Sequence, residues 1–168
     1  SITGFGCWPL KILKTLYFIL YSTIMQFDPN NKINKLCADG MNLEGEGKLE
    51  EASALFYQAW NEASNDVEKF TAAHYVARQQ KSVADKLHWD RTALEFALKS
   101  RDENVEATYP SLYLNIAKCY EDLEDFPNAE INYKLALSFA GLLPDEGYGK
   151  MIKAGIRSGL ERIEGKSA

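Results

Sequence analysis

The sequence predicts an all-α protein built from repeated pairs of helices. Three short pairs recur along the chain, 38 and 39 residues apart: Ala59-Trp60, Ala97-Leu98 and Ala136-Leu137. An aromatic residue or Leu lies three residues before each Ala, at Phe56, Leu94 and Tyr133. A period of this size with two amphipathic segments per unit is typical of a helical solenoid. No stretch alternates apolar and polar residues for long enough to predict a strand.

The length, charge and cysteine content of the chain argue against several classes of protein. The 168 residues fit one domain with a core shared between stacked helices. The net charge of -5 and the scattered Lys and Arg residues argue against nucleic-acid binding. The three cysteines, Cys7, Cys37 and Cys119, form no C-x-x-C pair and predict neither a disulfide framework nor a zinc site. Reduced thiols indicate a cytoplasmic protein.

The first 24 residues differ from the rest of the chain. They are aromatic and apolar, contain no acid, and carry only Lys11 and Lys14 as charges. The apolar run is shorter than the roughly 20 residues that span a bilayer, so no membrane span is predicted. Three alternatives remain: a signal peptide, an extra helix docked on the repeats, or sequence translated upstream of a true start at Met25. The repeat domain is then residues 25–168.

The first unit begins after the helix-start signal Asp28-Pro29-Asn30-Asn31. Its first helix carries one apolar face: Ile33, Leu36, Gly40 and Leu43. Gly45-Glu46-Gly47 ends this helix. The second helix carries Leu49, Ala52, Phe56, Ala59, Trp60 and Ala63, and the polar residues 64–66 form the turn that follows.

The second and third units follow the same plan. The second, residues 67–101, has Phe70, Ala73 and Ala77 on its first helix and Leu87, Leu94, Ala97 and Leu98 on its second. Residues 102–104 form a polar break. Pro110 suits the first turn of the next helix. The third unit carries Tyr113, Ile116, Ala117 and Tyr120, then Phe126, Ala129, Tyr133, Ala136 and Leu137.

A last amphipathic segment is predicted at residues 145–164. Asp145 can cap it, and its apolar face comprises Tyr148, Met151, Ile152, Ile156, Leu160 and Ile163. A stack of repeats needs a terminal helix with one polar face to shield its open end. This segment is therefore predicted to be a capping helix.

These patterns resemble the tetratricopeptide repeat (TPR) family. The first copy matches its large, small and aromatic positions through Leu36, Gly40, Leu43, Gly47, Leu49, Ala52, Phe56 and Ala59. The third copy matches through Tyr113, Ala117, Tyr120, Phe126, Ala129, Tyr133 and Ala136. The resemblance implies a right-handed helical-hairpin solenoid of about three units plus the capping helix. The spacing exceeds the family's usual period of about 34 residues, so extra residues are expected in loops. Residues 73–80 and 109–115 also resemble a group of small bacterial repeat proteins of unclear role.

The second copy departs most from the family pattern. Counted back from Ala97, its two small positions are occupied by Arg78 and Asp90. One interpretation is an ion pair between the two helices, with the bidentate geometry that Arg favours. The other is a change of loop length that moves both residues to the surface. The sequence leaves both open.

Catalytic and metal-binding patterns are not found. His74 and His88 lie 14 residues apart, with no Cys or carboxylate at ligand spacing. His74 falls at a packing position, which favours a structural histidine. No nucleotide-binding loop or nucleophile motif is present. The prediction is a protein with no enzymatic activity, metal or cofactor.

The family resemblance instead implies a peptide-binding groove along the first helices of the units. The candidate groove residues are Tyr75, Gln79, Asn115, Lys118, Met41, Arg78 and His74. The chain has Cys37 and Met41 where some family members hold a C-terminal carboxylate with Lys and Asn, which argues against that ligand.

The leading functional hypothesis is an adaptor that binds a protein or peptide in this groove. A second is a structural module that forms a homodimer through apolar surface. A minor third is an accessory or enzymatic role in RNA metabolism.

Overall fold

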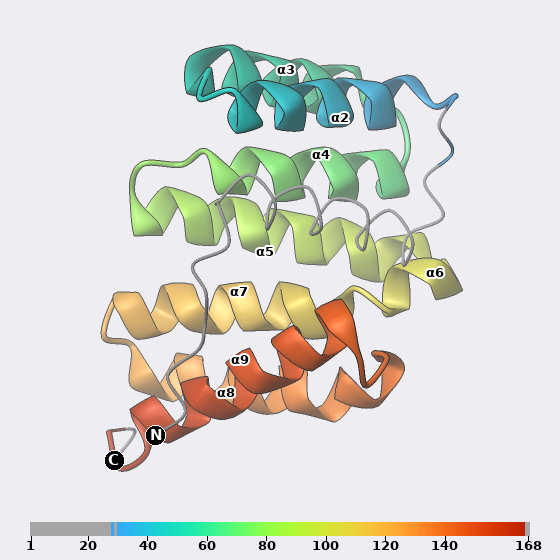
Figure 1. Ribbon diagram of the computed structural model, residues 1–168. Helices are drawn as coiled ribbons and strands as arrows, with labels where there is room; N and C mark the ends of the chain where they lie inside the picture. Colours follow the sequence, from blue (N-terminus) through green and yellow to red (C-terminus); the bar gives the residue numbers. More distant parts are fainter. Residues whose placement is uncertain (1–27, 29, 167–168) are drawn as a thin grey trace, which may run out of the picture.

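The computed structural model describes residues 28 and 30–166, and the segment at residues 1–24 lies outside them. The described residues are all-α: eight α-helices and one short 3₁₀-helix, η1 (Ala140–Leu142), follow one another (Figure 1). The prediction of an all-helical protein is confirmed. Among the described residues no helix is both long enough and apolar enough to cross a membrane.

Six helices form three sequential pairs, and the two helices of each pair pack against each other (Figure 1). The pairs are α2 (Lys32–Gly45) with α3 (Leu49–Glu62), α4 (Asp66–Arg78) with α5 (Val83–Ser100), and α7 (Tyr109–Asp122) with α8 (Phe126–Phe139). Contacts of α4 with α2 and α3, and of α5 with α7, join the pairs. The last helix, α9 (Gly147–Ile163), packs on both α7 and α8.

Polar side chains begin most of these helices. Asn31 accepts hydrogen bonds from the backbone N–H groups of Ile33 and Asn34 at 2.8 and 3.1 Å, as the start signal predicts. Asn65, Ser82 and Asp125 cap α4, α5 and α8 in the same way. Short local sequence signals therefore fix most of the helix starts.

Two local expectations need correction. The polar break after α5 contains a helix of its own, α6 (Glu103–Glu106), because the Asp102 side chain accepts from the Asn104 N–H at 2.9 Å and caps a turn. Asp145 does not cap α9, which begins one residue later than an Asp145 cap would require, after Glu146. The Asp145 carboxylate instead pairs with Lys153 at 2.6 Å.

The core lies between the paired helices. Phe56 and Tyr133 are fully buried, as the repeat pattern predicts. Each packs against a glycine of another helix: a Cβ on Gly40 would lie 2.4 Å from the Phe56 ring, and one on Gly159 would lie 2.2 Å from the Tyr133 ring. Both glycines are required because these helices approach so closely.

The second member of two of the three repeated pairs does not face the core. Leu98 and Leu137 were expected on the packed faces of α5 and α8, but each is 47% exposed. The Ala that precedes each of them is fully buried, and one residue turns a helix by about 100°. The recurring Ala-Leu pairs therefore mark the edge of the buried face, with Leu on its outer side.

Candidate functional site

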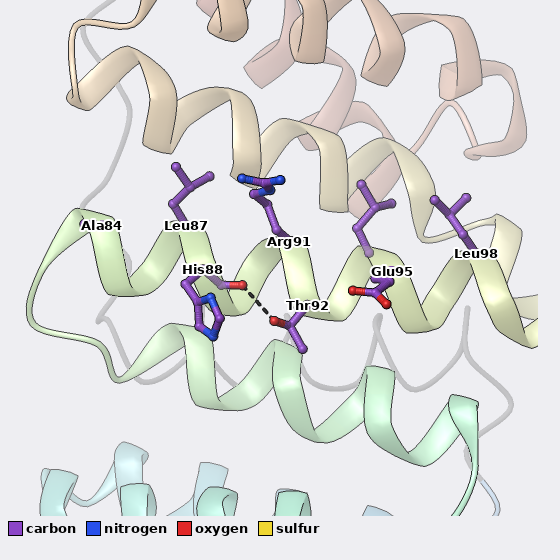
Figure 2. A pocket seen from close by; sticks show the side chains of 8 residues that line it. Ala84, Leu87, His88, Arg91, Thr92, Glu95 and Leu98 are labelled. Atoms are coloured by element: carbon purple, nitrogen blue, oxygen red, sulfur yellow. Dashed lines mark hydrogen bonds between the residues drawn. The ribbon is translucent and has the colours of Figure 1, made fainter.

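A hollow of about 620 Å³ lies along the outer face of α5. Among the described residues, eight line it, and all belong to this helix: Ala84, Leu87, His88, Arg91, Thr92, Leu94, Glu95 and Leu98. Figure 2 shows Leu87, Arg91 and Leu98 along one side of the helix, with His88, Thr92 and Glu95 on the adjacent side. The site is thus an elongated surface that follows one helix.

The opposite face of α5 holds the helix in place. Ala93 and Ala97 are fully buried. The rings of Trp89 and Phe96 meet Trp60 of α3 edge-on, with centroids 5.1 and 5.8 Å apart. At the helix start, Ser82 caps the N–H of Asp85 at 3.0 Å. One face of α5 is anchored on α4 and α7, and on α3 through these rings, so among the described residues the remaining face is the accessible one.

The polar groups of the hollow are arranged around Arg91. Glu95 pairs with Lys99 one turn along the helix at 2.6 Å, and the Thr92 hydroxyl donates to the His88 carbonyl at 2.9 Å. Among the described residues Arg91 makes no ion pair or hydrogen bond, and its side chain is exposed. The hollow therefore offers a cation flanked by Leu side chains.

The structure corrects the expected position of Tyr75 and His74. Both were predicted to line an open groove, yet each is only 3% exposed. The Tyr75 ring stacks on the core residue Phe56 with centroids 5.3 Å apart. Burial lowers the pKa of His74 to about 3, so this histidine is neutral at physiological pH. The burial of His74 agrees with the packing position that the sequence also assigned to it and disagrees with its place among the groove residues.

Three other predicted groove residues lie near one carboxylate. Glu44, at the end of α2, accepts from Arg78 Nη2 at 3.0 Å and also from the Gln79 amide at the end of α4. Met41 is half-buried and packs against the same core cluster as Phe56. Arg78, Gln79 and Met41 therefore lie at the junction of the first two helix pairs.

The remaining two predicted groove residues lie on α7. Lys118 is exposed and pairs with Asp122 on its own helix, and Asn115 is half-buried. Neither lies at the α5 hollow. Whether any of the seven predicted residues binds a peptide stays a prediction.

Arg78 and Asp90 do not pair, and Asp90 does not lie on the surface. Asp90 is 1% exposed, and its Oδ2 accepts from Lys86 and, at 3.6 Å, from Cys119 Sγ of α7. Its Oδ1 has no hydrogen-bond partner among the described residues. Burial raises the pKa of the Asp90 carboxyl, although the Lys86 ammonium opposes the shift.

The greater length of α5 explains why Arg78 does not reach Asp90. This helix has 18 residues, whereas α3 and α8 have 14 each. All three helices end three residues after their repeated Ala, so Asp90 aligns with the buried Ala52 and Ala129 and the additional turn lies at the start of α5. Counting back across that turn into α4 reaches Arg78, whereas the residue equivalent to Gly40 and Ala117, eight residues after the first of its helix, is His74.

The described cysteines have little nucleophilic character. Burial raises the pKa of the Cys37 thiol to about 12 and that of Cys119 to about 11. Both stay protonated near neutral pH, and the thiolate is the reactive form. Within residues 30–166 no three His, Cys, Asp or Glu side chains come together as a metal site.

A further carboxylate joins α9 to the third helix pair. Glu121 accepts two hydrogen bonds from Arg162, at 2.7 and 2.9 Å, and one from the Tyr133 hydroxyl at 2.5 Å. These bonds, with that from Arg162 first, lower the pKa of Glu121 to about 2. The predicted last helix is thus fixed to the body by an ion pair as well as by packing.

No protein-family model, curated protein or solved structure matches this chain.

Sequence reasoning missed the α5 hollow, although a signal was present. Ala84, Leu87, Arg91, Leu94 and Leu98 are spaced 3, 4, 3 and 4 residues apart, which places them on one side of a helix. Three of them, Leu87, Leu94 and Leu98, were assigned to the packed face; Leu94 does pack against the core cluster, whereas Leu98 is 47% exposed. Periodicity shows that residues share a face, but it does not show whether that face meets protein or solvent.

Proposed function

We propose that this chain is a protein-binding adaptor with a TPR-like architecture, whose partner contacts the outer face of α5. The repeat period, the three sequential helix pairs and the final helix support this architecture. Helical-repeat proteins act mainly by presenting extended surfaces to other macromolecules.

The single observation that carries the proposal is the hollow along α5, whose described lining residues all come from this one helix. Sites for small molecules collect polar groups from several elements around a concave cavity. Here apolar and polar side chains alternate along an open helix face instead. Such a surface suits a partner that is itself extended, such as a helix or a peptide.

The groove along the first helices is less well supported as the main contact surface. Its proposed aromatic anchor, Tyr75, is already in contact with Phe56 in the core. An interface anchor must be accessible to the partner before binding. Asn115 and Lys118 on α7 remain candidates for a secondary contact.

The test compares two matched leucines. Leu98 and Leu137 are equally exposed and each lies two residues before the end of its helix. We expect Leu98→Asp to reduce at least tenfold the amount of the main partner captured from native lysate, identified by mass spectrometry. Leu137→Asp should leave that capture intact.

Two results would contradict the proposal. One is equal capture by wild type and Leu98→Asp, with both folded by circular dichroism. The other is equal loss of capture in both variants, which would indicate a non-specific effect of the added charge.

Self-association is the second candidate function, because α8 also exposes large apolar side chains. Ile131, Leu135 and Leu137 are 55%, 37% and 47% exposed. Neighbouring apolar side chains on one surface mark candidate interfaces. Sedimentation velocity separates the two functions: a dimer that Leu135→Asp dissociates would favour self-association, and a monomer at all concentrations would exclude it.

A further inference from the structure

The residues that line the α5 hollow also indicate what kind of partner would bind there. Five of its residues, Ala84, Leu87, Arg91, Leu94 and Leu98, form what we call the α5 seam. Their spacing of 3, 4, 3 and 4 residues is that of the a and d positions of a coiled coil. A face of this kind is complementary to a second α-helix that crosses it at a shallow angle.

Resting on the proposed function, we propose that the partner is an amphipathic α-helix of another protein, with a carboxylate opposite Arg91 and apolar side chains on either side. The seam covers about 21 Å at the 1.5 Å rise of an α-helix, which corresponds to about four turns of the partner. Leu87 and Leu98 would supply the apolar contact, together with the accessible part of Leu94, which also packs against the core.

Arg91 determines the chemistry of the partner because it lies at the middle of the seam. Two seam residues precede it and two follow it. A helix laid over Leu87 and Leu94 would also cover the guanidinium group. A charge that loses water without a counter-charge is strongly unfavourable, so a wholly apolar helix would be rejected.

The surrounding charges point to the same conclusion. The protein has a net charge of -5, yet the seam contains one cation and no acid. The nearest carboxylate of the hollow, Glu95, lies beside the seam and is paired with Lys99. Arg91 is therefore available to a carboxylate of the partner, with which it can form a two-point hydrogen bond.

A second copy of the chain does not satisfy this requirement. Parallel pairing of two α5 seams places each residue opposite itself, so Arg91 faces Arg91. Antiparallel pairing with full overlap is centred on the same residue and gives the same contact. Like charges at the centre of an interface are repelled, which excludes a symmetric α5 dimer and favours a different chain.

The experiment uses two designed peptides of about three heptads, each with Leu at the outer a and d positions. One carries Glu at the central position and the other carries Lys. Binding of the labelled peptides to the full chain is followed by fluorescence anisotropy, up to about 1 mM protein and at two salt concentrations. We expect wild type to bind the Glu peptide at least tenfold more tightly, and Arg91→Glu to reverse the preference.

Two control variants locate the effect. Arg157 is an exposed arginine on α9, outside the seam, so Arg157→Glu makes the same change of charge elsewhere. It should keep the preference of wild type for the Glu peptide. Leu98→Asp should weaken binding of both peptides at least fivefold, while circular dichroism shows all variants folded.

Failures of the inference and of the proposed function give different results. Binding that needs Leu98 but does not distinguish Glu from Lys would overturn the carboxylate rule and leave an α5 contact surface in place. Absence of binding by either peptide, or binding indifferent to Leu98→Asp, would overturn helix docking at the seam. The capture experiment with Leu98→Asp and Leu137→Asp would then decide the proposed function independently. A wild-type dimer that Leu98→Asp dissociates would show that a second copy occupies the seam.

Discussion

The two helices of the middle pair, α4 and α5, differ in how much of their surface is exposed to solvent. All eight residues from 70 to 77 of α4 are buried, including Tyr75 and His74. In α5 only Asp90, Ala93 and Ala97 are buried, and along the seam Ala84, Arg91 and Leu98 are exposed while Leu87 and Leu94 are half-buried. The difference arises from position, because α4 packs against α2, α3 and α5. Polar residues on a first helix can therefore belong to the core, and apolar residues on a second helix can form the accessible surface.

The largest expected effect tests the buried side of this comparison. Tyr75→Ala should lower the free energy of unfolding by about 3–5 kcal/mol, because it removes a ring that stacks on Phe56 within the core. Urea unfolding followed by circular dichroism measures the change. A change below about 0.5 kcal/mol would show that Tyr75 is a surface residue and that α4 resembles α5.

A second prediction concerns the carboxylate that joins α9 to the body. Glu121→Gln should cost about 1–3 kcal/mol near neutral pH, because it weakens the hydrogen bonds from Arg162 and Tyr133. The folded pKa of Glu121 is lowered, from an ordinary 4.5 to about 2. Its contribution is therefore present above about pH 4.5 and is lost as the pH falls toward 2. The cost of the substitution should shrink in urea titrations below pH 4.5, and a cost that is constant with pH would contradict this account.

The third prediction concerns Asp90, whose pKa shift has the opposite direction to that of Glu121. Burial raises the pKa of Asp90, so this carboxylate favours folding most when it is protonated, and its contribution is lost as the pH rises through its folded pKa. Asp90→Asn should therefore raise the free energy of unfolding by about 1 kcal/mol near neutral pH. The gain should disappear below the ordinary pKa of 3.8.

A matched control is available for this carboxylate. Asp85→Asn changes an exposed residue at the start of the same helix and should give no gain. Loss of stability in Asp90→Asn at neutral pH would show that the bond from Lys86 outweighs the cost of burial.

The smallest expected effect tests the open side of the comparison. Leu98→Asp and Leu137→Asp should each change the free energy of unfolding by no more than about 0.5 kcal/mol, because both side chains are half exposed on outer faces. Thermal melts of the two variants should match within that range. A large loss in Leu98→Asp alone would mean that the α5 seam is part of the core.

The sequence by itself determined the helices and most of their ends. Apolar spacing predicts α2, α3, α7, α8 and α9, and Asn31, Gly47 and Pro110 mark boundaries through backbone chemistry that needs no tertiary contact. It also predicted the buried Phe56 and Tyr133, because these positions recur with the same neighbours in two copies.

Only the tertiary structure decided which faces are covered. A helical period identifies a shared face, but burial depends on the helices that pack around it, and these come from distant parts of the chain. The tertiary packing therefore stacks Tyr75 on Phe56 and brings Asp90 within hydrogen-bonding distance of Lys86 and Cys119. It also leaves Leu98 exposed to solvent. It also separated Arg78 from Asp90: Asp90 is buried at the position that Ala52 and Ala129 occupy in the other pairs, while Glu44 of another helix pair binds Arg78.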